Sequence, residues 1–201
     1  MLELEQSLWG KGVSRVAGID EAGRGALAGP VVAAAVILPE SNLLIRGLND
    51  SKKLSPAERD RLFAVVSSAA SAVGVGKASA EDIDRYNIRQ ANLKAMRAAV
   101  DALAREPEHL LIDGIDRISW NGPQDAVVKG DSKSLSVAAA SIVAKVTRDR
   151  IMIAYDATYP EYGFVRHKGY GTPEHVEAIR LHGRCPLHRV SFRLKNEPAI
   201  T

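Results

Sequence analysis

The stretch GIDEAGRGALAGPVVAAAVIL, residues 18–38, decides how the chain is expected to fold. One apolar run leads into it at residues 15–20, a second fills residues 31–38, and Gly and Pro bound both runs. Short apolar runs between such residues are typical of buried strands, and we expect these two strands to be neighbours. Two adjacent acids, Asp20 and Glu21, stand at the end of the first run, directly before Gly-Arg-Gly. The stretch therefore predicts two paired strands with acidic side chains at one end.

Length and composition indicate one soluble globular domain, which we place over residues 1–201. The single cysteine, Cys185, excludes an internal disulfide framework and fits a reducing cytoplasm. The N-terminal sequence MLELEQSLWGKG has acids where a signal peptide would carry basic residues. The longest apolar run, VVAAAVIL, is far too short to span a bilayer. We therefore expect a cytoplasmic protein without membrane contact, and a monomer by default.

The rest of the chain alternates helix and strand signals. Helix starts are marked by Ser55-Pro-Ala-Glu58, by Ser79-Ala-Glu-Asp82 and by Thr172 followed by proline. Further expected elements are strands at 72–78 and 109–113, an amphipathic helix over 87–105, a buried alanine-rich helix over 135–155 and a short helix that ends near residue 183. This order predicts an α/β fold with a central sheet and a helical C-terminal segment.

Four acids lie at the ends of expected strands or before an expected helix: Asp20 and Glu21 follow one strand, Asp113 follows another, and Asp131 precedes the long helix. Burying an acid at the end of an apolar run is costly unless charge or hydrogen bonds compensate for it. Converging carboxylates would suit a hard cation, and oxygen ligands favour Mg²⁺ or Mn²⁺. Successive strand residues point to opposite faces, so either the strand bends at Glu21 or Glu21 contributes through its backbone carbonyl.

The Gly-Arg-Gly loop, Gly23–Gly25, is not a nucleotide-binding loop of a known kind. Gly29 and Pro30 stand where the helix of a dinucleotide fingerprint would begin, and no Lys-Ser/Thr completes a phosphate loop. We expect an exposed, flexible backbone that carries one cation, Arg24, beside the acidic site. Residues 164–195 hold seven Lys or Arg against two acids, which suggests a face for an anionic polymer.

Five motifs in this order and spacing resemble the ribonuclease HII family of bacteria. They are GIDEAGRG (18–25), DSKKL (50–54), LLIDG (110–114), KGDSKSLSVAAASIVAKVTRD (129–149) and HKGYGT (167–172). The resemblance spans residues 13–192 and is specific as a set. It implies a ribonuclease H-like fold with a five-stranded mixed sheet flanked by helices. It also implies a catalytic core at about 13–160 and a substrate-gripping segment at about 161–195.

The resemblance also implies an activity. The family's four catalytic and metal-binding acids correspond to Asp20, Glu21, Asp113 and Asp131, and two Mg²⁺ or Mn²⁺ ions would carry the catalysis. We expect cleavage of the RNA strand of RNA–DNA hybrids and cutting 5′ of single ribonucleotides in duplex DNA. The products would carry 5′-phosphate and 3′-hydroxyl ends, and the cellular role would be ribonucleotide excision repair.

Substrate contacts are implied in the same way. The family's loop that reads the ribose 2′-hydroxyl corresponds to Gly23, Arg24 and Gly25, and its stacking tyrosine to Tyr170. Phosphate contacts are expected from residues of the two Asp-Ser-Lys motifs, since most protein–DNA contacts go to the backbone. These residues are Lys52, Ser132 and Lys133.

Three other functions are weighed against this one. A ribonuclease HIII-like nuclease would share the acids, but that family carries a long N-terminal extension and lacks a tyrosine matching Tyr170. A zinc-binding module would use the histidines and the cysteine of the C-terminal segment, but structural zinc sites usually need more sulfur ligands. These residues are His167, His175, His182, Cys185 and His188, and His175 is expected at the surface. A non-catalytic duplex binder would not need all four acids.

Overall fold

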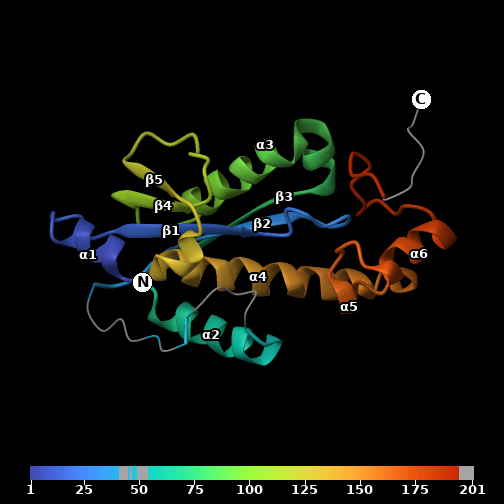
Figure 1. Ribbon diagram of the computed structural model, residues 1–201, viewed down its shortest axis with the longest axis horizontal. Helices are drawn as coiled ribbons and strands as arrows, with labels where there is room; N and C mark the ends of the chain where they lie inside the picture. The colour runs from blue at the N-terminus through green and yellow to red at the C-terminus, as the bar shows by residue number, and fades with distance from the viewer. Residues whose placement is uncertain (41–44, 46, 49–53, 195–201) are drawn as a thin grey trace.

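The computed structural model describes residues 1–40, 45, 47–48 and 54–194. One mixed sheet lies at its centre, with the strand order β3-β2-β1-β4-β5 (Figure 1). The strands are β1 (Val16–Ala22), β2 (Val31–Ile37), β3 (Ala72–Ala78), β4 (His109–Asp113) and β5 (Gln124–Val127). β1 pairs antiparallel with β2 and parallel with β4, while β2–β3 is antiparallel and β4–β5 parallel. The expected α/β fold with a five-stranded mixed sheet is confirmed.

Helices cover both faces of this sheet. α3 (Ala80–Asp101) lies on one face, and α4 (Leu135–Asp156) lies on the other with α2 (Pro56–Ala69) packed behind it (Figure 1). The remaining helical elements are α1 (Glu3–Trp9), the short turns η2 (Gly130–Ser132) and η3 (Pro160–Tyr162), α5 (Phe164–His167) and α6 (Pro173–His182). The last three form a lobe at the far end of α4. Of the helices described, none has the length and apolarity needed to span a membrane.

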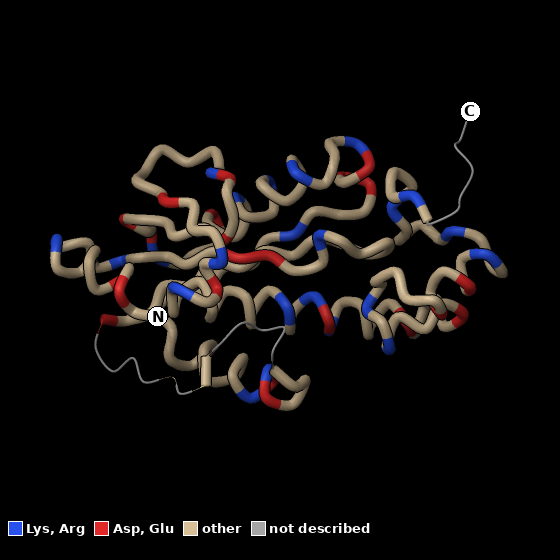
Figure 2. The backbone as a smooth tube through the Cα atoms, viewed as in Figure 1, with Lys and Arg blue, Asp and Glu red and all other residues tan. Residues whose placement is uncertain are grey.

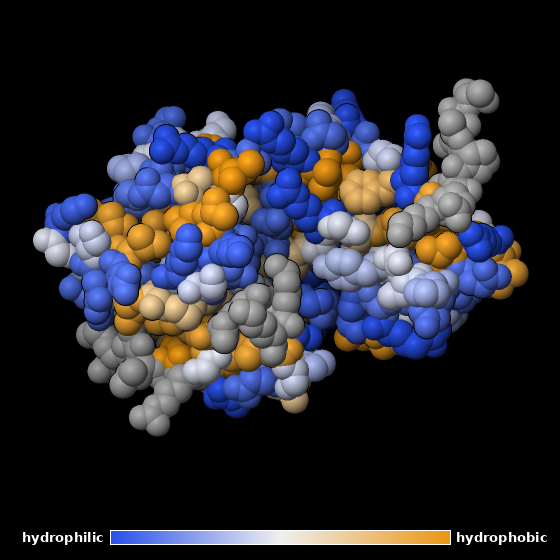
Figure 3. Space-filling model, in the orientation of Figure 1, coloured by the Kyte–Doolittle hydropathy of each residue, from blue (hydrophilic) through white to orange (hydrophobic). Residues whose placement is uncertain are grey.

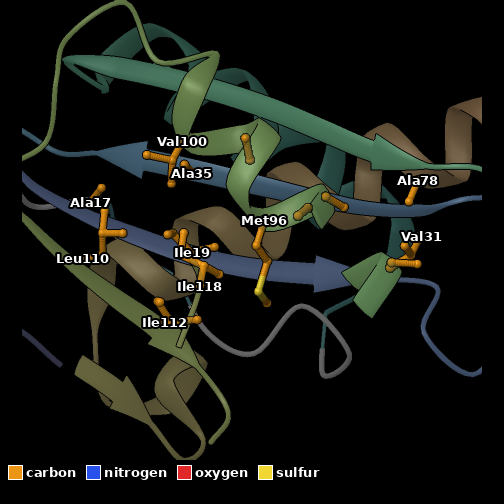
Figure 4. Close-up of a cluster of buried hydrophobic side chains, with 14 of the residues drawn as sticks. Ala17, Ile19, Val31, Ala35, Ala78, Met96, Val100, Leu110, Ile112 and Ile118 are labelled. Carbon is orange, nitrogen blue, oxygen red and sulfur yellow. The ribbon is translucent and has the colours of Figure 1, made fainter. Parts of the chain in front are cut away.

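The core has two layers because the central strands are buried on both sides. All seven residues of β2 are buried, as expected for a strand between two covering layers. Ile19, Ile112 and Met96 belong to the layer between the sheet and α3 (Figure 4). Hydrophobic residues form only small patches among hydrophilic ones on the face shown in Figure 3. Burial of these layers thus accounts for the apolar runs in the sequence.

The closest approach between the layers occurs at Gly18 on β1. A Cβ atom at this position would lie 2.1 Å from the carbonyl carbon of Ser136 in α4. Only a glycine therefore allows α4 to rest directly on the central strand. This contact sets the distance between α4 and the acids at the end of β1.

Two elements were not anticipated from the sequence. β5 has the short polar sequence QDAV and lies at the edge of the sheet, so it lacks the apolar run that marks a buried strand. α1 is short, but its Glu5 is fully buried. The Glu5 carboxylate accepts hydrogen bonds from the Ser134 hydroxyl at 2.6 Å and from the Ser136 amide at 2.9 Å, which places a negative charge at the start of α4.

The expected helix starts are present, with differences in detail. Ser79 and Asp82 form a reciprocal capping box at α3. Ser55 accepts from the Glu58 amide, but the Glu58 carboxylate binds Arg61 at 2.7 Å instead of completing the box. α3 begins at Ala80, earlier than the amphipathic pattern indicated, because a kink at Asn87 separates its first turns from the rest.

The C-terminal lobe contains three buried histidines, so the surface position expected for His175 is wrong. The ring of His167 stacks on that of His175 at 4.3 Å, and the Nε2 atoms of His175 and His188 lie 3.1 Å apart. His175 is fully buried, because its helix faces Phe164 and the other two rings. Burial lowers the pKa of His175 and His188 to about 4, so these rings pack as neutral groups.

We predict that Gly18→Ala destabilises the protein by about 3 kcal/mol, the upper end of overpacking costs, because α4 must move off the strand. The melting temperature should fall by roughly 6–12 °C in a thermal unfolding experiment. Gly25→Ala is the control, since a Cβ there meets nothing within 4 Å. Equal melting temperatures for the two variants would contradict the close approach of α4 to β1.

Candidate active site

Asp20 and Asp113 lie side by side on the α4 face of the sheet. β1 and β4 run parallel, with Ile19 opposite Ile112, so the next residues on the two strands are the two aspartates. Strand alternation puts Asp20 on the same face as Gly18, against α4. Ser141 of α4 donates a hydrogen bond to the Asp20 carboxylate. Figure 2 shows the acidic stretch of β1 in the middle of the molecule.

Asp131 is brought to the same end of the sheet by the short turn η2. The Gly130 amide donates to Asp113 Oδ1 at 2.6 Å, which ties this turn to the end of β4. Lys129, directly before it, has a left-handed backbone with φ of 57°, a conformation that non-glycine residues adopt rarely. Asp131 is 8% exposed and Asp20 is 5% exposed. Thus three acids from three separate segments lie at the same end of the sheet, near the start of α4.

The carboxylates of this site destabilise one another. Burial, and then the neighbouring charges of Glu21 and Asp113, raise the pKa of Asp20 well above its usual value. In the described parts of the chain, no three His, Cys, Asp or Glu side chains lie close enough together to hold one metal ion. A donor set made only of carboxylate oxygens fits a hard divalent cation.

Glu21 is oriented differently from the other acids. β1 keeps its register through Ala22, with Glu21 opposite Ala33, so the strand does not bend at Glu21. Its side chain therefore leaves the other face of the sheet, where Glu21 Oε1 lies 3.9 Å from Nη1 of Arg24. The bend that the sequence left open as one route is therefore absent from β1, while the charge of Glu21 still raises the pKa of Asp20.

The loop after β1 is firmly held, which corrects the expectation of a flexible backbone. Gly23 is buried, whereas Arg24 and Gly25 are exposed. The guanidinium of Arg189 donates to the carbonyls of Gly23 at 2.7 Å and of Arg24 at 2.9 Å. Arg148 of α4 holds the end of the same loop through the carbonyl of Ala28 at 3.0 Å. No helix follows the loop, as expected.

Tyr170 lies beside this loop. The Leu27 amide donates to the Gly169 carbonyl at 2.8 Å, which joins the two segments. The tyrosine ring is half-buried, with Lys145 Nζ 5.5 Å and Arg148 Cζ 5.1 Å from its centre. An aromatic ring flanked by cations and partly open to solvent is suited to contact a sugar next to a phosphate.

A groove of about 630 Å³ extends from Tyr170 between α2 and the C-terminal lobe. Its basic residues are Arg59, Lys145, Arg150, Arg166 and Lys168. Ser132 and Lys133 are exposed at the start of α4, next to Asp131. Lys52 lies outside the described residues. The basic face is smaller than the sequence count suggested, because Arg184 and Arg189 turn their guanidinium groups toward backbone carbonyls.

The zinc interpretation does not fit the C-terminal lobe. His167, His175 and His188 bind one another and backbone carbonyls. Within the described residues, neither these side chains nor Cys185 belong to a group positioned to hold a metal. His167, His175 and His188 are therefore packing residues, whereas His182 is exposed.

Comparison with known proteins shows which family shares these features. The family model described as Ribonuclease HII matches residues 17–195. A ribonuclease HII of Geobacter metallireducens is 57% identical over 94% of this chain and 92% of its own length, and one of Geobacillus kaustophilus is 55% identical over 96% and 73%. The crystal structure of ribonuclease H2 from Pyrococcus horikoshii superposes with a TM-score of 0.75 at 28% identity, covering 89% of this chain and 93% of that one.

The chain belongs to the ribonuclease HII family. It is therefore an endonuclease of the type 2 ribonuclease H class, a metal-dependent family. A ribonuclease HIII structure in complex with Mn²⁺ has a TM-score of 0.67 at 22% identity and shares the fold alone.

Ser141, Arg148 and Arg189 were missed in the sequence although they surround the site. Ser141 and Arg148 stand seven residues apart in α4, two helical turns, and so share one face. Arginines in an otherwise alanine-rich buried helix are an available signal, because such charges are seldom fully buried without a partner.

We predict that Asp20→Asn raises the melting temperature of chelator-treated protein by roughly 2–4 °C, about 1 kcal/mol for a chain of this size. The reason is that the folded state disfavours the charged form of Asp20. The same substitution should reduce the further rise that Mn²⁺ produces in the unmodified protein.

The control for this experiment is Asp101→Asn. Asp101 binds Arg97 at 2.7 Å, and this pairing lowers its carboxyl pKa, so the variant should lose a little stability. A lower melting temperature for Asp20→Asn in chelator would contradict the proposed repulsion.

Proposed function

We propose that this enzyme cleaves the RNA strand of RNA–DNA hybrids and cuts 5′ of single ribonucleotides embedded in duplex DNA. The products would carry 5′-phosphate and 3′-hydroxyl ends, and the cellular role would be ribonucleotide excision repair. The observation that carries the proposal is the placement of Asp20, Asp113 and Asp131 at one end of the sheet, beside a hydrogen-bonded loop with exposed residues. We also propose that the protein acts as a monomer.

Mg²⁺ or Mn²⁺ is the proposed cofactor, as two ions held by Asp20, Asp113 and Asp131, with Glu21 contributing through its carbonyl oxygen. When bound, the ions supply an activated water and stabilise charge on the departing 3′-oxygen. The raised pKa of Asp20 supports this role, because a cation relieves the repulsion from Asp113 and Glu21. The Ser141 hydroxyl donates a hydrogen bond to the Asp20 carboxylate, and the Gly130 amide donates one to Asp113. These two hydrogen bonds orient the carboxylates.

Substrate selection is proposed for the loop and for Tyr170. Arg24 and Gly25 face solvent next to the acids, where a backbone donor reaches the 2′-hydroxyl that separates RNA from DNA. Tyr170 would stack on the deoxyribose that follows the ribonucleotide. Ser132 and Lys133 would contact phosphates at the start of α4. The same role is proposed for Lys52.

The C-terminal segment, about residues 161–195, is proposed to grip the duplex, with the catalytic core at about 13–160. Support comes from the groove beside Tyr170 and its basic residues, which suit a phosphate backbone.

A second solved structure of similar fold is that of the Archaeoglobus fulgidus ribonuclease HII in a complex with PCNA. It has a TM-score of 0.74 at 27% identity and covers 92% of this chain and 98% of that one.

We predict that Asp113→Asn lowers the rate of cleavage at a lone ribonucleotide by about three orders of magnitude, since it removes a charged metal ligand. Duplex binding should be retained, because the basic groove is unchanged. The two quantities are measured by single-turnover cleavage and by fluorescence anisotropy in chelator. Loss of cleavage and binding to the same degree would contradict a catalytic role for Asp113.

We predict that Tyr170→Ala lowers cleavage at a lone ribonucleotide by roughly 10- to 100-fold, the effect of losing about 1–3 kcal/mol of stacking. Cleavage within a long RNA–DNA hybrid should fall less, because a junction with DNA is not needed there. The melting temperature should change little, since the ring is half-buried. Equal losses on the two substrates, or no loss on the lone ribonucleotide, would contradict the stacking role of Tyr170 at the junction with DNA.

A further inference from the structure

Two arginines, Arg148 and Arg189, are fully buried behind the Gly23–Gly25 loop. The hydrogen bonds described for their guanidinium groups all run to backbone carbonyls. Arg148 donates to three residues and Arg189 to three others, which are Ala28, Pro30 and Lys168 for Arg148, and Gly23, Arg24 and Gly29 for Arg189. Five of these six carbonyls lie between residues 23 and 30. Burying a guanidinium costs several kcal/mol, so two at one loop require an explanation.

The packing of the loop is built around these groups. A Cβ at Gly23 would lie 1.8 Å from Nε of Arg148, so the glycine leaves the space that the arginine occupies. Gly23 also has a positive φ of 90°, which a larger residue would strain. At Gly25, by contrast, the position of a Cβ is open. The first glycine therefore serves the arginine, and the second lies free on the outer side.

Arg189 determines which way the peptide groups of the loop face. In a planar trans peptide, the C=O and the following N–H point in opposite directions. Because the carbonyls of Gly23 and Arg24 point inward to Arg189, the N–H groups of Arg24 and Gly25 point outward. Within the described residues, neither of these amides donates a hydrogen bond. The result is a pair of adjacent, outward donors next to the acids.

Arg148 connects this loop with Tyr170. Its Nη1 donates to the carbonyl of Lys168 at 2.9 Å, two residues before the tyrosine. Its Cζ lies 5.1 Å from the centre of the Tyr170 ring. One side chain thus contacts both segments proposed to read the substrate, and it sets the separation between the outward amides and the aromatic ring.

We propose that Arg148 and Arg189 are positioning residues for ribonucleotide recognition. Arg189 turns the amides of Arg24 and Gly25 toward the 2′-hydroxyl oxygen, and Arg148 sets the distance from these amides to Tyr170. A planar fork of donors holds two consecutive carbonyls at once, which the single ammonium of lysine does not do. Two buried positive charges behind the loop also polarise its amides toward an acceptor oxygen. This inference rests on the proposed function.

The test compares Arg189→Lys and Arg189→Met with Arg184→Met. Arg184 is the matched control, because it also donates to two backbone carbonyls of the same segment, those of Arg189 and Phe192, and none of the hydrogen bonds described for it runs to the loop. Single-turnover cleavage at a lone ribonucleotide should fall about 100-fold in Arg189→Met and less in Arg189→Lys, as expected when a reacting group is misplaced by about 1 Å. Arg184→Met should stay within about twofold of the unmodified protein.

Two further measurements separate positioning from a general loss of structure. Duplex affinity in chelator should be unchanged in Arg189→Lys, so that the defect lies in the cleavage rate. The ¹⁵N–¹H resonances of the Arg24 and Gly25 amides should shift in Arg189→Lys and stay in place in Arg184→Met. If Arg189→Met does not fold, the cleavage rate and the amide resonances of Arg189→Lys test the inference.

Normal cleavage by Arg189→Lys with unshifted amides, or an equal loss in Arg184→Met, would overturn the inference. The amide shifts are independent of cleavage. A protein that cleaves no ribonucleotide therefore refutes the proposed function and leaves the orientation of the loop to be judged from these resonances.

Discussion

The burial of Asp20 next to the charges of Glu21 and Asp113 is the constraint on which the rest of the structure depends. Parallel pairing of β1 with β4 puts the carboxylates of Asp20 and Asp113 on one face, where burial and like charge raise the pKa of Asp20. Gly18 lets α4 pack directly against β1, next to the carboxylates. The hydrogen bond from the Gly130 amide to Asp113 ties the turn that contains Asp131 to the end of β4. The fold thus loses stability by concentrating negative charge at one place, and we propose that a divalent cation restores this stability.

α4 organises the chemistry and the recognition together. Ser141 contacts Asp20, and Arg148, two turns later on the same face, contacts the loop and Tyr170. A cation placed among backbone carbonyls, instead of beside the acids of the candidate site, orders the loop without neutralising the carboxylates. The acidic centre and the basic support behind the loop therefore remain separate although both depend on one helix.

Much of this arrangement follows from the sequence, for identifiable reasons. β1 and β4 are apolar runs that end in acids, and α6 has both a threonine cap and a proline at its first position. β5 is short and polar, so no local pattern marks it, and the family resemblance implied five strands without locating this one. The burial of His175, Arg148 and Arg189 depends on tertiary contacts with segments distant in the chain. Local propensity contains no information about such contacts.

The most direct test of this account is a cleavage assay with a DNA duplex that carries one ribonucleotide, beside an all-DNA duplex and an RNA–DNA hybrid, in Mg²⁺ or Mn²⁺. The account predicts a cut on the 5′ side of the lone ribonucleotide, no cut in the all-DNA duplex, and loss of activity on chelation. Cleavage of the hybrid alone, or of the lone ribonucleotide in chelator, would contradict it.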